Sequence, residues 1–322
     1  MTLEYDRMLA LLAPEYLAYT ERARLEGGPA LSELSVAEAR KLMRDMQQSD
    51  LSAYPVKAER HMLDGFSVLV LKPASADDLL PSVVYFHGGG WVLGDAETHA
   101  RMVREIAVQA HAAVVFVEFA CAPEAPFPLA LEQCYRACAW VAERGHTAGL
   151  DSSRIAIAGD SAGGNLAAAV ALLAARRGGP DIRLQALLYP VTDCEFSTLS
   201  YRDFGTGLNL DIAAMRWFWQ HYIPDPAMRH DPLASPLRAQ TEDLRGLPPA
   251  LVFTAECDVL RDEGEAYARK LANAGVAVNS VRYMGTLHAF MMIDEFAREA
   301  QAASAMRLLT SELREALKDR NG

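Results

Sequence analysis

Residues 154–164, RIAIAGDSAGG, hold the stretch that decides the fold. Arg154–Ala158 is a short apolar run typical of a buried strand, and a helical pattern over Gly163–Arg176 follows directly. A serine between glycines at a strand-to-helix turn can adopt the strained backbone that exposes its hydroxyl at the carboxyl edge of a sheet. Ser161 is therefore the candidate nucleophile. A phosphate-binding loop or a plain turn is the alternative, but the Walker lysine and the dinucleotide spacing are missing.

Outward from this turn, short β-branched runs alternate with longer helical patterns from about Val56 onward. Eight runs are predicted strands: Lys57–Leu63, Ser67–Leu71, Ser82–Phe86, Ala113–Phe119, Arg154–Ala158, Leu184–Leu188, Ala250–Thr254 and Ala277–Tyr283. Predicted helices are His99–Ala110, Leu129–Arg144, Gly163–Arg176, Glu263–Ala274 and, approximately, Ile293–Lys318. The later runs are nearly continuous and apolar, whereas the first two are mixed and fit an antiparallel edge. We expect an α/β fold with an eight-stranded, mostly parallel sheet flanked by helices.

Two segments do not follow this alternation. Residues 1–50 have a helical pattern and precede the first strand. Residues 192–244 contain a helix start at Asp211, a cluster of aromatic residues and a proline-rich stretch. We expect the two segments to meet as a helical cap above a catalytic domain formed by residues 51–191 and 245–322.

Composition excludes several classes of partner. The chain has 322 residues, of which 51% are hydrophobic and 23% charged, and its formal net charge is −11. Without a cluster of Lys or Arg, this charge disfavours nucleic acids and anionic membranes. The longest purely apolar run, Leu166–Ala175, has ten residues, about half of the ~20 that a membrane span needs. An acidic beginning with Glu4 and Asp6 does not fit a secretory signal, so we expect a cytoplasmic protein.

Cysteine and histidine usage argues against disulfides and metals. The five cysteines form an odd set without a CxxC pair, and we expect reduced thiols. The eight histidines are scattered, with no His-Glu-x-x-His motif and no Cys/His cluster in the sequence. We therefore predict no metal and no other cofactor.

A serine hydroxyl needs a group that holds the developing oxyanion. The sequence His87–Gly90 follows the predicted strand Ser82–Phe86 and should reach the same sheet edge as the serine. The backbone amides of Gly88, Gly89 and Ala162 are the predicted oxyanion donors. A flexible glycine turn is the alternative. We expect His87 to fix the conformation of this loop rather than to transfer protons.

A general base and an orienting acid are expected after the last two strands, in the chain order serine, acid, histidine. His288 follows the final strand and is the candidate base. Asp258 is the candidate acid, because Glu256 is still close to the strand end while Asp262 and Glu263 fall at the next helix start. Asp160 could tune the neighbourhood of the nucleophile beside it, but we expect its side chain to cap the following helix.

Together these residues resemble the bacterial hormone-sensitive-lipase-like (type IV) carboxylesterases of the α/β-hydrolase superfamily. The resemblance covers nearly everything from about Leu51 to the C-terminus. It rests on His87–Gly90, Ala122-Pro123-Glu124, Phe127-Pro128, Gly159–Gly164, Tyr189-Pro190, Asp258–Gly264, and Gly285 with His288 and Phe290. It implies Ser161 as nucleophile, Asp258 as acid, His288 as base, and an oxyanion hole of Gly88, Gly89 and Ala162. It also implies a helical cap and hydrolysis of short-to-medium acyl esters without a cofactor.

The chain departs from the family pattern at two places. Ala289 stands where the family usually has glycine after the catalytic histidine. Ala120-Cys121 stands where the family usually has an Arg-Leu pair before Ala-Pro-Glu. The second departure leaves Glu124 without the partner that such an arginine would provide.

The predicted function is that of a serine carboxylesterase acting on a small-molecule ester. Hydrolysis of a lactone or an amide by the same triad is an alternative, and a non-catalytic ligand-binding protein is another. Trp91, Trp217 and Trp219 are candidate walls of the substrate pocket, although either of the last two fits the cap's own core. Apolar Met306 and Leu309 on the last helix would permit a dimer, so we expect a monomer or a homodimer.

Overall fold

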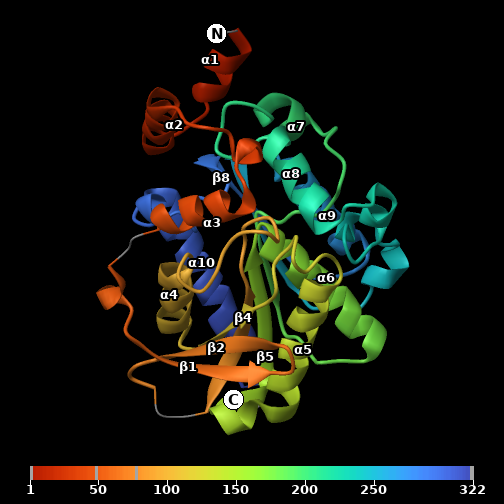
Figure 1. Ribbon diagram of the computed structural model, residues 1–322. Helices are drawn as coiled ribbons and strands as arrows, with labels where there is room; N and C mark the ends of the chain where they lie inside the picture. Colours follow the sequence, from red (N-terminus) through yellow and green to blue (C-terminus); the bar gives the residue numbers. More distant parts are fainter. Residues whose placement is uncertain (1–2, 48–49, 77–78, 320–322) are drawn as a thin grey trace.

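The computed structural model describes residues 3–47, 50–76 and 79–319 (Figure 1). It contains one eight-stranded sheet in the order β1-β2-β4-β3-β5-β6-β7-β8. The strands are β1 Val56–Leu63, β2 Phe66–Pro73, β3 Leu80–Phe86, β4 Ala113–Glu118, β5 Leu150–Asp160, β6 Gln185–Leu188, β7 Ala250–Cys257 and β8 Val278–Leu287. All eight predicted strands are confirmed. The prediction of an antiparallel edge is also confirmed, because β1 pairs antiparallel with β2 and β2 with β4, while the other pairs are parallel.

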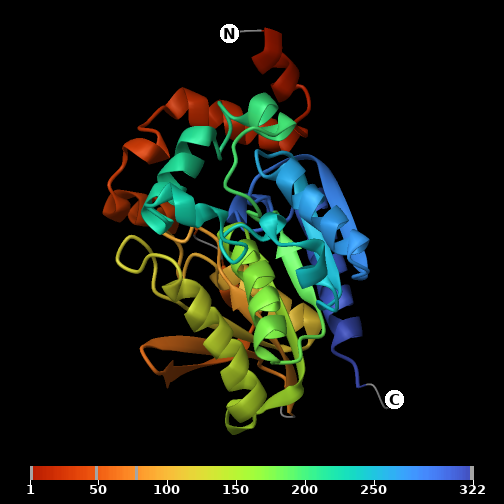
Figure 2. The ribbon, with the colours of Figure 1, turned by 90° about the vertical axis from the view of Figure 1, so that its right-hand side faces the viewer.

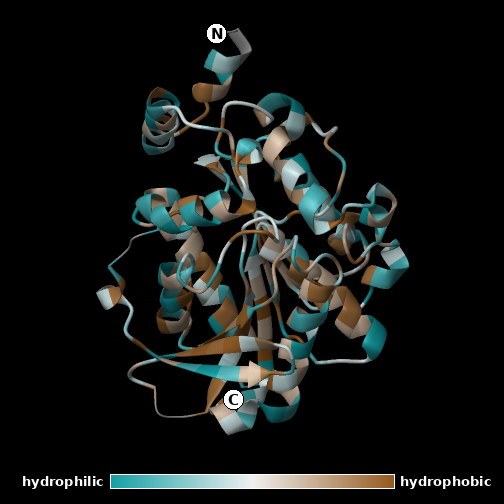
Figure 3. Cartoon of the chain, viewed as in Figure 1, coloured by the Kyte–Doolittle hydropathy of each residue, from teal (hydrophilic) through white to brown (hydrophobic). Residues whose placement is uncertain are grey.

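Helices cover both faces of this sheet. The long ones are α4 Ala100–Ala110, α5 Leu129–Arg144, α6 Ala162–Arg177, α9 Arg261–Asn273 and α10 Ala300–Ala316. In Figure 1, α4 and α10 lie on one side of the sheet and α5 and α6 on the other. Hydropathy follows the layers, since the central strands are mostly apolar and the outer helix faces carry the polar residues (Figure 3). The predicted α/β-hydrolase architecture is confirmed.

The last helix begins later than its pattern predicts. Residues Asp294–Phe296 form a short 3₁₀ turn, and α10 begins only at Ala300. The backbone before it bonds elsewhere: Arg101 Nη2 donates to the carbonyls of Met291 and Met292, at 2.6 and 3.0 Å. These contacts hold residues 291–294 in a series of turns rather than in the first turn of the helix.

The dimer argument from the last helix is wrong. Met306 is 3% exposed and Leu309 is fully buried, because this face of α10 packs on the core.

Among the described helices, none combines the length and the hydrophobicity that crossing a membrane requires.

The segments expected to form a cap lie at one end of the molecule. These are α1 Leu3–Leu9, α2 Pro14–Glu26 and α3 Val36–Asp45 from the N-terminal region, and α7 Leu199–Phe204 and α8 Ile212–Tyr222 from the insert. Both views place them opposite the chain's C-terminus (Figures 1 and 2). From Pro226 onward the insert returns through short 3₁₀ turns that contact α6 and α9. The division into domains stays a prediction.

Candidate active site

The nucleophile turn has the strained geometry that the glycines predict. β5 ends at Asp160 and α6 begins at Ala162, so Ser161 alone forms the turn, with φ 55° and ψ −117°. A Cβ on Gly163 would overlap the carbonyl oxygen of Phe86, and one on Gly159 would overlap that of Gly163. Only glycine at these two positions allows strand and helix to approach this closely. Ser161 is thereby held at the carboxyl edge of the sheet.

Three distant side chains meet at this turn. His288 Nε2 lies 3.0 Å from Ser161 Oγ, and His288 Nδ1 lies 2.8 Å from Asp258 Oδ2. Asp258 is 2% exposed, and its other oxygen accepts the backbone N–H of Leu260 at 3.0 Å. Because a carboxylate only accepts, Nδ1 carries the proton and Nε2 is left to accept the serine hydroxyl. The three predicted triad residues are thus in mutual hydrogen-bond contact.

The predicted oxyanion role of Gly88 conflicts with the structure. Its backbone N–H donates to Asp160 Oδ1 at 2.9 Å and is therefore already used. The next two glycines, Gly89 and Gly90, line the cavity together with Ser161. Among the residues that the structure describes, no acceptor bonds to the amide of either. The free amides begin one residue later than the sequence suggested, because Asp160 engages the first one.

Asp160 does not cap α6 as expected. It is 1% exposed and accepts the hydroxyl of Tyr85 at 2.8 Å in addition to the Gly88 amide, and His99 Nε2 lies 3.5 Å from the same oxygen. Burial raises the pKa of Asp160, but the contacts with His99, Tyr85 and Gly88 outweigh burial and hold the pKa below its ordinary value. A buried, ionised carboxylate therefore anchors the glycine loop from below.

His87 packs beneath the same loop. Its ring stacks on Phe119 with centroids 4.1 Å apart, and its Nδ1 lies 2.8 Å from the carbonyl oxygen of Gly88. Burial and the neighbouring His99 lower the pKa of His87 to about 4. His87 is therefore neutral near pH 7 and is suited to fixing the loop, as the sequence analysis expected.

Backbone strain is concentrated around the triad. In the described part of the chain, five non-glycine residues have positive φ: Trp91, His111, Ser161, Tyr189 and Ala289. All except His111 lie at the site, since Trp91 and Ala289 line the cavity and the Tyr189 ring centroid is 5.2 Å from that of His288. Strain of this kind persists only where the surroundings hold it, and it is common at functional sites.

Comparison with known proteins shows the family of this chain. A family model described as alpha/beta hydrolase fold matches residues 83–292. The chain belongs to this family. The predicted resemblance and the predicted enzyme class, a serine hydrolase, are confirmed.

Individual relatives of the hydrolase cover most of its length. A carboxylesterase of Mycobacterium tuberculosis is 41% identical over 71% of this chain and 72% of its own, and an ethyl acetate hydrolase of Pseudomonas putida is 38% identical over 74% and 76%. The crystal structure of a thermostable esterase from Pseudomonas putida superposes with a TM-score of 0.93 at 44% identity, covering 96% of this chain and 98% of that one.

The hydrolase has a large apolar cavity above Ser161. Its volume is about 740 Å³, and its walls come from the N-terminal helices, the glycine loop, the insert and the turn after His288. Met43, Met215, Phe218 and Met292 are among the lining side chains. Flexible methionines adapt to ligands of different shape. The cavity is therefore suited to an apolar group that is attached to the reacting carbonyl.

Of the three tryptophans predicted as pocket walls, only Trp91 lines the cavity. Trp219 is fully buried and packs against Trp91, with ring centroids 4.9 Å apart. Trp217 contacts His221 on its own helix, with centroids 4.2 Å apart. The assignments of Trp217 and Trp219 are therefore wrong.

Sequence analysis missed the two residues of α8 that do face the cavity, Met215 and Phe218. They lie three positions apart after the helix cap at Asp211 and so share one face of the helix. That spacing was visible in the sequence, but it did not show which face of α8 lies toward the serine.

A different arginine replaces the one that is missing from the Ala120-Cys121 position before Ala-Pro-Glu. Arg40 on α3 binds Glu124 with both terminal nitrogens, at 2.9 and 2.7 Å, and also donates to the carbonyls of Val92 and Ala122. Arg40 lowers the pKa of Glu124 to about 2. An arginine from the N-terminal segment thus supplies the partner that Ala120-Cys121 cannot.

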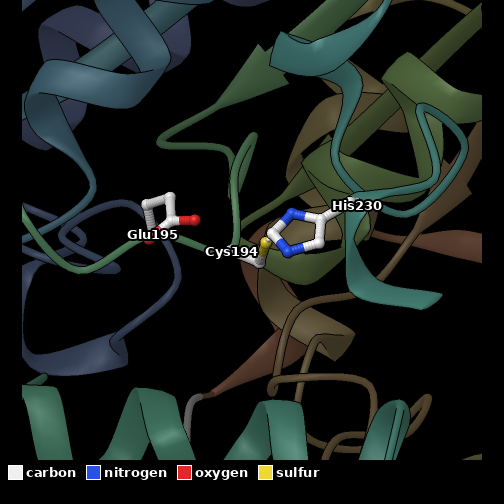
Figure 4. Close-up of side chains that lie close together, drawn as sticks. All are labelled: Cys194, Glu195 and His230. Carbon is white, nitrogen blue, oxygen red and sulfur yellow. Dashed lines mark hydrogen bonds between the residues drawn. The ribbon is translucent and has the colours of Figure 1, made fainter. Parts of the chain in front are cut away.

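One cluster of potential metal ligands is visible in the described residues (Figure 4). Cys194 Sγ lies 3.5 Å from His230 Nδ1, with Glu195 beside them. Glu195 accepts a hydrogen bond from Arg238 at 2.8 Å, and burial raises the pKa of the Cys194 thiol. The engaged carboxylate and the protonated thiol both disfavour a metal at this cluster. That the protein binds no metal stays a prediction.

Proposed function

We propose that this protein is a serine carboxylesterase that hydrolyses short-to-medium-chain acyl esters. The observation that carries the proposal is the continuous relay from Asp258 through His288 to Ser161, at 2.8 and 3.0 Å, on the floor of an apolar cavity. The names of the carboxylesterase and the ethyl acetate hydrolase among its relatives support an ester as the substrate.

Acylation begins when Ser161 attacks the ester carbonyl. His288 Nε2 takes the hydroxyl proton, and Asp258 orients the imidazole and stabilises its protonated form without being protonated itself. The carbonyl oxygen becomes an oxyanion, for which the amides of Gly89, Gly90 and Ala162 are the proposed donors. Each such donor contributes about 3–4 kcal/mol to transition-state stabilisation.

Collapse of the tetrahedral intermediate releases the alcohol, which takes the proton from His288. The acyl group then remains on Ser161 as an ester. Water enters, gives a proton to His288 and attacks the acyl carbonyl under the same amides, and the acid is released as Ser161 regains its proton. Every proton in this cycle passes through His288.

The cavity supports the proposed range of chain lengths. A volume of about 740 Å³ lies within the range of roughly 300–1,000 Å³ that is typical of small-molecule pockets. Its lining is largely apolar, which suits an alkyl chain but offers little to a second charged group. We expect the rate to decline once the acyl chain is longer than the cavity.

The test is hydrolysis of p-nitrophenyl esters from acetate to palmitate by the native protein and by Ser161→Ala. We expect the variant to lose about 10⁴-fold or more in kcat, because only binding and the oxyanion hole remain. Ser280→Ala, an exposed serine on β8, is the matched control. Activity retained by Ser161→Ala would reject the assignment. One amide and one lactone belong in the same assay, and a faster rate on either would replace the ester as the substrate class.

A further inference from the structure

The turn that carries the catalytic base is strained directly after the histidine. Ala289 has a φ of 59°, in the left-handed region that favours glycine. The Cβ of alanine disfavours this region, so the turn keeps its geometry with a residue that would otherwise relax toward negative φ. Since His288 and Ala289 share a peptide group, relaxation of Ala289 would also turn the backbone that aims the imidazole.

Hydrogen bonds hold both ends of this turn but leave its centre free. The carbonyl of Ala289 accepts the amides of Met292 and Ile293 at 2.9 and 3.0 Å. Before the turn, the amide of Gly285 donates to Glu256 at 2.7 Å. Neither set of contacts involves the peptide group between His288 and Ala289.

Asn209 binds that peptide group from the cap. It lies between α7 and α8, lines the cavity, and donates from Nδ2 to the carbonyl oxygen of His288 at 2.8 Å. In the described part of the chain, it is the one side chain recorded as bonding to this oxygen. To move Ala289 toward negative φ, the 288–289 peptide plane must rotate and carry the oxygen away from Asn209. The hydrogen bond therefore opposes the relaxation that the alanine favours.

We propose that Asn209 is a positioning residue for the catalytic base, whose side-chain amide holds the His288–Ala289 peptide so that Nε2 faces Ser161. The inference rests on the triad of the proposed function. It assigns the insert a part in the chemistry as well as in lining the cavity. It also explains how Ala289 keeps a left-handed φ directly beside the catalytic histidine.

The test compares Asn209→Ala and the isosteric Asn209→Asp, each alone and combined with Ala289→Gly. Asn209→Ala should lower kcat on p-nitrophenyl butyrate about five- to tenfold, with KM within about twofold, because an imprecise base slows proton transfer. Asn209→Asp keeps the shape of the side chain but loses the N–H donor, so its kcat should fall as far as that of Asn209→Ala. Its carboxylate should also move the acid limb of the kcat/KM profile to higher pH, because it favours the imidazolium.

The Ala289→Gly substitution distinguishes a positioning role of Asn209 from a merely structural one. Glycine adopts a φ near 59° without strain, so Ala289→Gly should restore most of the kcat lost in Asn209→Ala. Thr206→Ala, in the same loop and away from the cavity, is the matched control and should retain the native kcat. Thermal unfolding of each variant checks that the fold is intact.

Three results would overturn the proposal. The first is an unchanged kcat in Asn209→Ala, and the second is an effect of that variant on KM alone. The third is an equal loss of kcat on Asn209→Ala whether position 289 holds the native alanine or glycine. The proposed function fails separately, through activity retained by Ser161→Ala, so the two failures are distinguishable.

Discussion

The carboxyl edge of the sheet and the cap above it surround the same cavity but are built differently. At the sheet edge, each triad residue directly follows or ends a strand, is buried, and bonds to the next triad member. In the cap, the lining residues come from both the N-terminal segment and the insert, and Asn209 is exposed. Strand ends can only lie where the sheet places them, whereas the cap contributes side chains from loops and short helices.

This difference suggests a division of roles, with the reaction carried out at the sheet edge and the choice of substrate made mainly by the cap. We expect variants at the sheet edge to slow every substrate alike or to unfold the protein. Variants of cap residues that only line the cavity should have smaller effects that depend on the substrate, whereas Asn209, which bonds to the His288 carbonyl, should affect every substrate. Asp258→Asn and Phe218→Ala test that division, and Arg101 and His87 test what stabilises the structure around the triad.

Asp258→Asn should have the largest effect. The amide cannot stabilise the imidazolium, and it can present its NH₂ to Nδ1 and so favour the wrong tautomer of His288. We expect kcat to fall about 10³- to 10⁴-fold on every p-nitrophenyl ester, with the fold unchanged by circular dichroism. A loss that varies strongly with chain length would contradict the proposed division.

Arg101→Met should cost about 3 kcal/mol or more in the free energy of unfolding. Arg101 is 6% exposed and binds Asp294, Glu105 and the carbonyls of Met291 and Met292. Removing it leaves the buried Glu105 and the partly buried Asp294 without their cationic partner. Urea unfolding measures the loss, and Arg101→Lys, which keeps the charge, should lose less. Equal losses in the two variants would mean that the charge contributes nothing.

Acidification should weaken the fold through His87. Because its folded pKa is about 4 while an unperturbed histidine titrates near 6.5, the unfolded state binds a proton first as the pH falls. The contribution is complete above pH 6.5 and is lost as the pH falls toward 4. Between pH 7.5 and 5 the loss is about 2 kcal/mol. In urea titrations at both values, His87→Asn should show a correspondingly smaller change, and an identical change would refute the assignment.

Phe218→Ala should have the smallest effect and the clearest dependence on substrate. The ring of Phe218 lies against Gly90 and lines the cavity, so its removal makes room beside the glycine loop. We expect the ratio of kcat/KM for octanoate over acetate to rise about tenfold, equivalent to about 1.4 kcal/mol. Trp217→Ala, outside the cavity lining, should leave this ratio within twofold. A shift in both variants would show that α8 moves as a whole.

Much of the sheet edge was predictable because strands and turns leave local patterns. Apolar runs gave all eight strands, and glycines around Ser161 gave the nucleophile turn. The order of Asp258 and His288 after successive strands was enough to propose the relay, since parallel strands bring their carboxyl ends to one edge. The shift of the free amides from Gly88 to Gly89 and Gly90 was not predictable, because it depends on where the buried Asp160 carboxylate points.

The cap was less predictable because its contacts are not local. Arg40 lies 84 residues from Glu124, and the sequence around either residue does not indicate that the two form an ion pair. The composition of α8 suggested tryptophans as pocket walls, but the packing of the helix buries Trp219 and turns Phe218 toward the cavity.

The amino-acid sequence by itself determined the eight strands and the strained serine turn, and it singled out the proposed acid and base, because each depends on residues close together in the chain. Only the tertiary structure decided which amides remain free above Ser161, which aromatic rings line the cavity and which side chain holds the His288–Ala289 peptide. Those features depend on the relative placement of segments far apart in the chain, and packing fixes that placement only when the whole molecule has folded.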